Sequence, residues 1–184
     1  MNSLIKSIVS SAKNLKNVSA IAVAAMMTAV IIVLSFYTFR PTEFLKISFG
    51  FLPLSIVSAL YGPVVGGLVG IAADLIGYAI SPGGPYFIGF TISGFLSGFI
   101  YGMFLYQKGG SFIRIVLAKL TVSLFVQIAL NSIWIKLLYG TPIIAMLPTR
   151  LLKNAILLPI EIALMFAVLK GLEKLTKQGR IPIK

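Results

Sequence analysis

Long apolar stretches alternate along this chain with short segments rich in glycine, proline and charged residues. A helix needs about 20 predominantly apolar residues to cross the hydrocarbon core of a bilayer, which is about 30 Å thick. Six stretches approach this length, at approximately 18–38, 47–61, 63–80, 86–106, 112–139 and 149–172. The second is the shortest and is expected to span only part of the membrane. The pattern therefore predicts an all-α integral membrane protein, a bundle of six transmembrane helices.

The composition agrees with a membrane protein, because 58% of the 184 residues are hydrophobic and only 11% are charged. Soluble domains carry about 25% charged residues, and this chain has too few to cover a core with a polar surface. It contains neither cysteine nor histidine, which excludes disulfides, thiolate nucleophiles, Cys/His zinc sites, His-ligated haem and histidine acid–base catalysis. With a single aspartate in the chain, an intramembrane enzyme lacks its catalytic pair. We therefore expect no enzyme, no cofactor and no metal site.

Basic residues dominate the charge, and the formal net charge is +12. They are scattered between apolar stretches and form no stripe interleaved with aromatics, so they do not indicate nucleic-acid binding. Ten lie in the tails and in the 107–114 loop: Lys6, Lys13, Lys16, Lys108, Arg114, Lys170, Lys174, Lys177, Arg180 and Lys184. By the positive-inside rule both termini are cytoplasmic. Residues 1–17 are expected to form a cytoplasmic tail or an interfacial helix, 18–172 the membrane domain, and 173–184 a basic cytoplasmic tail.

The three loops predicted on the outer face, 39–46, 81–90 and 139–150, combine proline, glycine, aromatic residues and cations. A lid over a planar anionic ligand uses both the aromatics and the cations, whereas an interfacial aromatic belt is the alternative. Arg40 and Arg150 are candidates for binding a carboxylate, since a guanidinium group binds carboxylates through two hydrogen bonds. For Arg150 the alternative is a side chain that reaches the lipid headgroups.

Glycines recur every four residues in two predicted helices, at Gly62, Gly66 and Gly70 and at Gly94, Gly98 and Gly102. Each set lies on one helix face, where backbones can approach closely. We expect both glycine stripes to pack inside the bundle, and contact with a partner protein is the alternative. The first helix carries alanines at the same spacing, a weaker signal for a docking face: Ala20, Ala24, Ala25 and Ala29.

A few polar residues lie within the predicted spans. Asp74 follows Gly70 by four residues on the glycine stripe, and an ionised carboxylate in a membrane costs several kcal/mol without a partner. It either pairs with an arginine or lysine or accepts two N–H donors from an amidine-like ligand edge. Asn131 and Trp134 share a helix face and offer an amide and a ring to a heterocycle, or bond neighbouring helices. For Glu161 we expect a structural role.

Motifs in a fixed order between residues 40 and 162 resemble a known family. They are Lys46-Ile-Ser-Phe-Gly-Phe-Leu-Pro53, Gly62-Pro-Val-Val-Gly-Gly67, Asp74-Leu-Ile-Gly-Tyr78, Gly84-Pro-Tyr-Phe-Ile-Gly-Phe-Thr91, Asn131-Ser-Ile-Trp134, Leu138-Tyr-Gly140, Pro148-Thr-Arg-Leu-Leu-Lys-Asn154 and Pro159-Ile-Glu161. In these the chain resembles the substrate-binding S components of energy-coupling factor (ECF) vitamin transporters, and most of all the folate family. The N-terminal helix is similar only in character.

The resemblance implies a six-helix protein of the prokaryotic plasma membrane, with cytoplasmic termini and a vitamin site near the outer face. It also implies docking, through first-helix alanines, to a transmembrane coupling subunit driven by two ATPases; which alanine pair docks stays open. The chain has no G-x-x-x-x-G-K-[ST] loop of its own, so ATP-driven work needs those partners. In this family the S component is thought to tip over in the membrane to present its site inside.

Folate fits the candidate residues. Its pterin edge suits Asp74, its flat rings suit aromatic side chains, and its glutamate tail suits cations. Thiamine is cationic and riboflavin is neutral, so neither gains as much from basic loops. The expected ligand-binding residues are Arg40, Lys46, Asp74, Tyr78, Pro85, Tyr86, Phe90, Asn131, Trp134 and Arg150. An S component for another vitamin, such as riboflavin or thiamine, and a non-transport membrane scaffold, which would need no buried Asp74, are the alternatives.

Overall fold

The computed structural model describes residues 2–37, 39–42, 45–82, 84–108 and 111–177, without the side chains of 2–3, 39–42, 45–47 and 175–177. Its helices are α1 (Asn2–Asn14), α2 (Val18–Phe36), α3 (Phe51–Tyr61), α4 (Pro63–Ile80), α5 (Ile88–Leu105), α6 (Phe112–Thr121), the π-helix η1 (Val122–Leu130), α7 (Asn131–Tyr139) and α8 (Ile143–Lys177). Two short strands, β1 (Phe39–Thr42) and β2 (Leu45–Ile47), lie between α2 and α3.

Each predicted apolar segment forms a helix, and within the described ranges five helical segments have the length and composition to cross a membrane. These are α2, α4, α5, the continuous helix formed by α6, η1 and α7, and most of α8. The remaining predicted segment, 47–61, forms α3, which has only 11 residues. The helical bundle is therefore confirmed, while the number of crossings stays a prediction.

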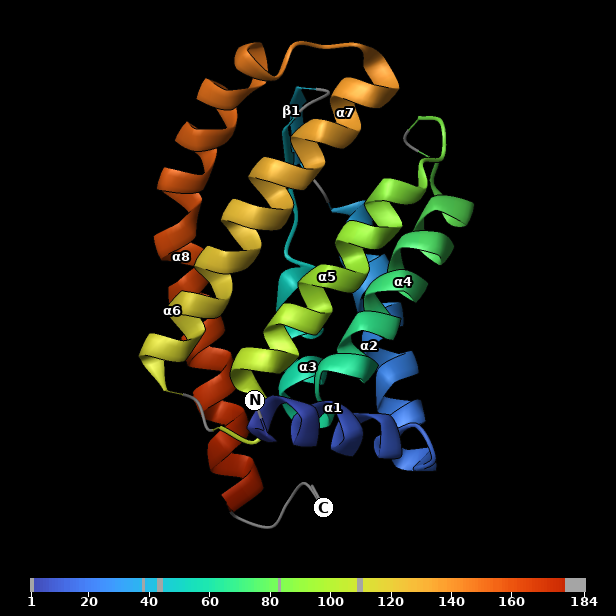
Figure 1. Ribbon diagram of the computed structural model, residues 1–184, viewed down its shortest axis with the longest axis vertical. Helices are drawn as coiled ribbons and strands as arrows, with labels where there is room; N and C mark the ends of the chain where they lie inside the picture. The colour runs from blue at the N-terminus through green and yellow to red at the C-terminus, as the bar shows by residue number, and fades with distance from the viewer. Residues whose placement is uncertain (1, 38, 43–44, 83, 109–110, 178–184) are drawn as a thin grey trace.

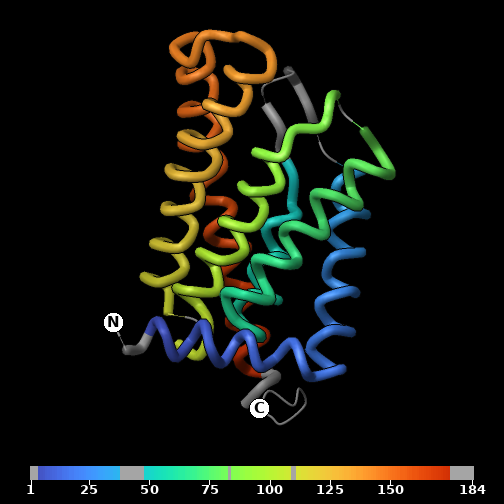
Figure 2. The backbone as a smooth tube through the Cα atoms, turned by 45° about the vertical axis from the view of Figure 1, so that its right-hand side comes forward, coloured from blue at the N-terminus to red at the C-terminus, as the bar shows by residue number. Residues whose placement is uncertain are grey.

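The helices run along the long axis of the molecule, and α1 lies across one end (Figures 1 and 2). The C-terminal part of α8 reaches that same end, whereas β1, the α4–α5 connection and the α7–α8 connection lie at the opposite end (Figure 1). The loops that the sequence assigns to the outer face thus gather at one end. The arrangement also brings α1 and the last turns of α8 to a common end of the bundle.

One predicted boundary was wrong, and one loop has more regular structure than expected. The last helix begins at Ile143 rather than near 149, so Pro148 lies inside α8. A proline interrupts the backbone hydrogen bonds of a helix, but membrane helices tolerate it where neighbouring groups satisfy the freed carbonyls. The first outer loop is also more regular than expected, because β1 and β2 pair in antiparallel fashion, Phe39 opposite Ile47 and Thr42 opposite Leu45.

The two glycine stripes pack inside the bundle, as predicted, and the structure shows that they meet each other between α4 and α5. A Cβ atom added at Gly94 would lie 2.7 Å from the carbonyl oxygen of Gly70, and one added at Gly66 would lie 2.8 Å from that of Gly98. Side chains at these positions would force the helices apart. Close backbone contact therefore holds α4 against α5, in the way that small residues pack membrane helices.

Helix α1 is fixed to the bundle through its polar face. Ser11 Oγ accepts hydrogen bonds from the N–H groups of Val64 (3.0 Å) and Val65 (3.3 Å) and donates one to the carbonyl of Tyr61 (2.8 Å). Asn14 Nδ2 donates to the same carbonyl at 3.1 Å. Because α4 follows a glycine, which has no side chain to cap it, Ser11 supplies the cap from another helix.

Candidate functional site

Asp74 lies one turn after Gly70 on α4 and faces α5. Thr91 Oγ1 of α5 donates a hydrogen bond to Asp74 Oδ2 at 2.6 Å, and Tyr86 Oη lies 2.8 Å from the same hydroxyl. Since a threonine hydroxyl has one hydrogen, Tyr86 must be the donor to Thr91. Among the described side chains no cation forms an ion pair with Asp74. The half-buried carboxylate thus keeps Oδ1 free to accept further hydrogen bonds.

Two tyrosines flank this carboxylate. Tyr78, one turn after Asp74, donates its hydroxyl hydrogen to the carbonyl of Gly84 at 3.0 Å. The rings of Tyr78 and Tyr86 lie 5.2 Å apart at 59°, a tilted contact typical of aromatic pairs. Tyr86 is 42% exposed, and Pro85 beside it is exposed as well. The α4–α5 loop therefore places accessible aromatic surface beside Asp74.

Asn131 and Trp134 bond α5 through one serine. Ser93 Oγ donates to Asn131 Oδ1 at 2.7 Å and accepts from Trp134 Nε1 at 3.1 Å. Phe87 lies against the Trp134 ring at 5.8 Å and against the Phe90 ring at 6.1 Å. Of the two interpretations of Asn131 and Trp134, contact with a neighbouring helix is thus present in the structure. The amide nitrogen of Asn131 makes no hydrogen bond to the described residues and is free to donate one.

The residues around Asp74 and the residues around Asn131 and Trp134 lie on either side of α5, near its N-terminal end. Thr91 and Ser93 are two residues apart, roughly 200° around the helix, so that one faces α4 and the other α7. The neighbours Tyr86 and Phe87 join the groups through the α4–α5 loop. The structure therefore brings Asp74, Tyr78 and Tyr86 together in one cluster, and Phe90, Asn131 and Trp134 together in a second.

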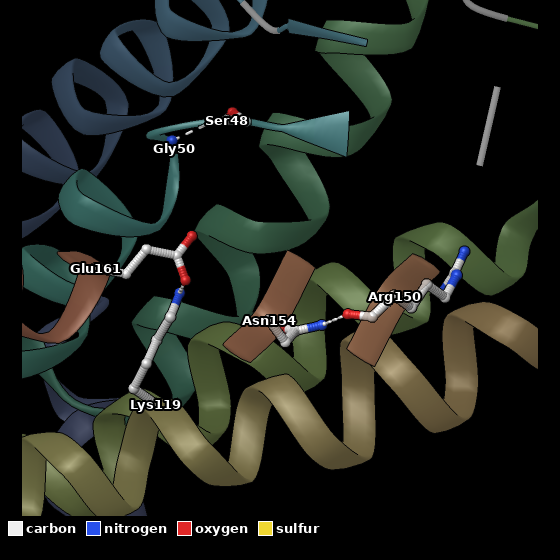
Figure 3. A network of polar contacts seen from close by, with 6 residues as sticks. All are labelled: Ser48, Gly50, Lys119, Arg150, Asn154 and Glu161. Atoms are coloured by element: carbon white, nitrogen blue, oxygen red, sulfur yellow. Dashed lines mark hydrogen bonds and ion pairs between the residues drawn. The ribbon is translucent and has the colours of Figure 1, made fainter. Parts of the chain in front are cut away.

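Arg150 is buried in the bundle. Its side chain is 7% exposed, and its Nη1 donates to the carbonyl of Gln127 in η1 at 2.7 Å. The Nε atom has no hydrogen-bond partner within the described part of the chain. Figure 3 shows Arg150 on α8, where its own carbonyl accepts a hydrogen bond from Asn154 Nδ2 at 2.8 Å. A guanidinium held inside in this way does not reach the lipid headgroups.

Arg40 and Lys46 belong to β1 and β2, but their side chains lie outside the described residues.

The alanines proposed for docking lie on α2, and they differ in exposure. Ala20 is 1% exposed and packs in the core, whereas Ala25 and Ala29 are exposed. An apolar groove of about 220 Å³ runs between α2 and α4, lined on the α2 side by Ala20, Ala24, Ala25 and Thr28 among others.

Three polar residues of the bundle were not predicted as site residues from the sequence: Thr91, Ser93 and Lys119. Thr91 and Ser93 organise the two clusters, and Thr91 had a usable signal, since it precedes Gly94 by three residues on the stripe that faces α4. Lys119 is fully buried and its Nζ lies 3.0 Å from Glu161 Oε2 (Figure 3). Its signal was a lone lysine inside an apolar stretch. The ion pair agrees with the structural role expected for Glu161.

These features define a multi-pass α-helical membrane protein with polar and aromatic residues gathered at one end. The chain matches the family described as "ECF transporter, substrate-specific component" over residues 19–169. It is 33% identical over 167 residues to "Folate transporter FolT" of Clostridium novyi (strain NT), across 91% of this chain and 97% of the relative. It is also 33% identical over 153 residues to "Folate transporter FolT" of Leuconostoc mesenteroides subsp. mesenteroides, covering 80% of this chain and 82% of the relative.

A solved structure agrees with these relatives. The fold matches "Crystal structure of FolT bound with folic acid" with a TM-score of 0.80 and 35% sequence identity, covering 84% of this chain and 95% of that one. The chain therefore belongs to the family of ECF transporter substrate-specific components. The resemblance that the sequence motifs indicate is confirmed.

Proposed function

We propose that this protein captures folate at the outer face of the prokaryotic plasma membrane and delivers it to an ATP-driven coupling module. Family membership, two relatives named as folate transporters and the fold match to a folic acid complex support the ligand. The observation that carries the proposal is Asp74. Its carboxylate is oriented by Thr91, lacks a cationic partner among the described side chains, and has an oxygen left for a ligand.

The pterin ring would bind at the Asp74 cluster. A carboxylate accepts two parallel hydrogen bonds from an amino group and an adjacent ring N–H, as it does from a guanidinium. Tyr78 and Tyr86 offer ring faces beside it. On the other side of α5, Phe90 and Trp134 add aromatic surface and Asn131 a free amide donor, while Pro85 shapes the loop between the two clusters.

The glutamate tail would bind the cations. The buried Arg150 guanidinium has an unpaired N–H at Nε, and a buried donor without a partner is unfavourable. A ligand carboxylate would satisfy it with a charge-assisted hydrogen bond. Arg40 and Lys46, carried by the β1–β2 hairpin, would supply further positive charge near the tail. The cations therefore favour folate over neutral riboflavin and cationic thiamine.

The proposed topology has six crossings and cytoplasmic termini, with residues 18–172 in the membrane and 173–184 in the cytoplasm. The common end reached by α1 and α8 (Figure 2) supports it, and so do the lysines in the sequences of α1 and of the last turns of α8. Residues 1–17 would lie at the cytoplasmic interface, since α1 exposes both apolar and basic side chains, Ile5, Val9 and Lys13 among them.

The transmembrane coupling subunit, which carries two ATPases, would dock on the outer surface of α2. Ala25 and Ala29 are four residues apart and both exposed, so a partner helix can approach the backbone closely there. Ala20 is buried and Ala24 half-buried, which leaves them less available to a partner. We therefore assign the docking contact to Ala25 and Ala29.

Identification of the small molecule that accompanies the purified protein tests the proposed function. We expect folate or a reduced folate in the mass spectrum of the heat-released ligand. Recovery of another vitamin would overturn the ligand assignment and keep the family. A protein that carries and binds no vitamin would favour the scaffold alternative.

A further inference from the structure

An ion pair lies inside the helical bundle, between α6 and α8. Lys119 Nζ lies 3.0 Å from Glu161 Oε2, and the two side chains are 0% and 14% exposed. Charged residues within membrane spans are unfavourable, and they commonly mark function. Replacing a buried pair with apolar residues of similar volume is often neutral or stabilising. Stability alone is therefore a weak explanation for this pair.

The Lys119 side chain is fully buried in the bundle. Ile115, Ala118 and Val122, which surround it on its own helix, are buried as well. Lys119 is the eighth residue of α6, so its Cα lies roughly 10 Å along the helix from the first residue. On α8, Met165 follows Glu161 by one turn and is fully buried. Both charges thus lie among buried side chains, and the buried Tyr101 of α5 is their polar neighbour.

A third element meets the pair. Phe51 is the first residue of α3, and its ring centroid lies 3.9 Å from the buried Lys119 Nζ, which is a cation–π contact. On the other side, a Cβ atom added at Gly50 would lie 3.3 Å from Ile31 Cγ2 of α2. The start of α3 is therefore held between α2 and the ammonium group.

The start of α3 is joined to the β1–β2 hairpin by three residues, 48–50. This turn is closed by a hydrogen bond from the Gly50 N–H to Ser48 Oγ at 3.3 Å, which Figure 3 shows in one view with the ion pair. So short a connection transmits the position of Phe51 to the hairpin. The hairpin carries Arg40 and Lys46, the cations assigned above to the ligand.

We propose that Lys119 and Glu161 are positioning residues for ligand capture. The ion pair fixes the ammonium group against Phe51, and Phe51 in turn holds the start of α3, to which the hairpin with Arg40 and Lys46 is joined. Neither residue touches the ligand in this arrangement. The inference rests on the proposed folate capture, and it adds residues at the α3–α6–α8 contact that determine affinity.

A double variant separates positioning from stability. Lys119→Met combined with Glu161→Leu removes both charges and leaves no unpaired one, so the melting temperature is expected to stay close to that of the wild type. Its Kd for folate is expected to rise roughly tenfold, the scale seen when support for a binding site is lost. A stable double variant that binds folate as tightly as the wild type would overturn the inference.

A second readout needs no ligand. Trypsin cleavage of the Lys46–Ile47 bond, followed by mass spectrometry, is expected to be several-fold faster in the double variant because the hairpin is less firmly held. Unchanged cleavage contradicts the positioning role. If the wild type bound no folate while cleavage still accelerated, the proposed function would fail and the structural coupling would stand.

If the double variant does not fold, Phe51→Leu tests the positioning role instead. It keeps both charges and most of the apolar volume but removes the cation–π contact. We expect weaker folate binding and faster cleavage at Lys46. The matched control is Phe166→Leu on α8, which removes the contact of the Phe166 ring with Lys170 Nζ at 4.9 Å and its edge contact with the Phe112 ring. Equal behaviour of the two variants would exclude a specific role for Phe51 and its ion pair.

Discussion

Thr91 of α5 donates its single hydroxyl hydrogen to Asp74 Oδ2 of α4 across 2.6 Å. The same hydroxyl oxygen lies 2.8 Å from Tyr86 Oη, so a directed chain of hydrogen bonds runs from the α4–α5 loop to the carboxylate. Asp74 also continues the glycine stripe that holds α4 against α5. Helix packing and the orientation of the candidate ligand group are thus parts of one arrangement.

Thr91→Val should weaken folate binding without unfolding the protein. The change keeps the shape but removes a hydrogen bond to a charged group, so Kd measured by calorimetry should rise roughly tenfold. Thr91→Ser should restore most of the affinity. Thr121→Val is the matched control, since that hydroxyl bonds only the Leu117 carbonyl of its own helix. Equal effects at positions 91 and 121 would contradict an orienting role.

Gly94→Ala should destabilise the bundle, because its Cβ would press on the carbonyl oxygen of Gly70. Overpacking of this kind costs about 1–3 kcal/mol, which lowers the melting temperature of a chain this size by about 2–12 °C. Gly77→Ala on α4 is the control, because the added atom has nothing within 4 Å. This variant should leave the melting temperature unchanged or raise it slightly. Similar losses at both positions would refute close α4–α5 packing.

Ser11→Ala should loosen the start of α4. The lost cap is worth about 1 kcal/mol, and hydrogen exchange of the Val64 and Val65 amides should accelerate. Ser111→Ala is a suitable comparison, because Ser111 precedes α6 without making a side-chain cap hydrogen bond. If the two exchange rates stayed at wild-type values, α1 would not cap α4.

Helix positions and the glycine stripes could be predicted from the sequence because both depend on local pattern. Apolar length alone fixes the spans, and a four-residue spacing places glycines on one face of each helix. Asp74 was located correctly for the same reason, as the next member of the α4 stripe. Its partner Thr91 was within reach, since it lies on the matching face of α5.

The remaining features depend on which helix faces meet. Lys119 and Glu161 are 42 residues apart in sequence, and no periodicity connects α6 with α8. Arg150 lies well inside α8 because this helix begins at Ile143. Pro148 suggested a later start, since proline is common at helix boundaries. Ser93 joins Asn131 to Trp134 only because α5 and α7 pack side by side. The sequence of neither helix indicates that the two are neighbours.

Ala25→Leu and Ala29→Leu should impair docking and leave ligand binding intact. Bulky side chains at exposed small residues keep a partner helix at a distance, so co-purification with the coupling subunit and its ATPases should fall, while folate affinity of the isolated protein should not change. Ala129→Leu, at another exposed position, is the control. Normal assembly of both α2 variants would move the docking surface elsewhere.

Folate titration of the purified protein and its Asp74→Asn variant by isothermal calorimetry tests the central claim most directly. The wild type should bind folate at one site, and riboflavin and thiamine far more weakly. The variant removes the charge from hydrogen bonds worth about 1.5–3 kcal/mol, so its Kd should rise by roughly a hundredfold while its melting temperature stays similar. A wild type that binds no folate, or a variant that binds it equally well, would contradict the account.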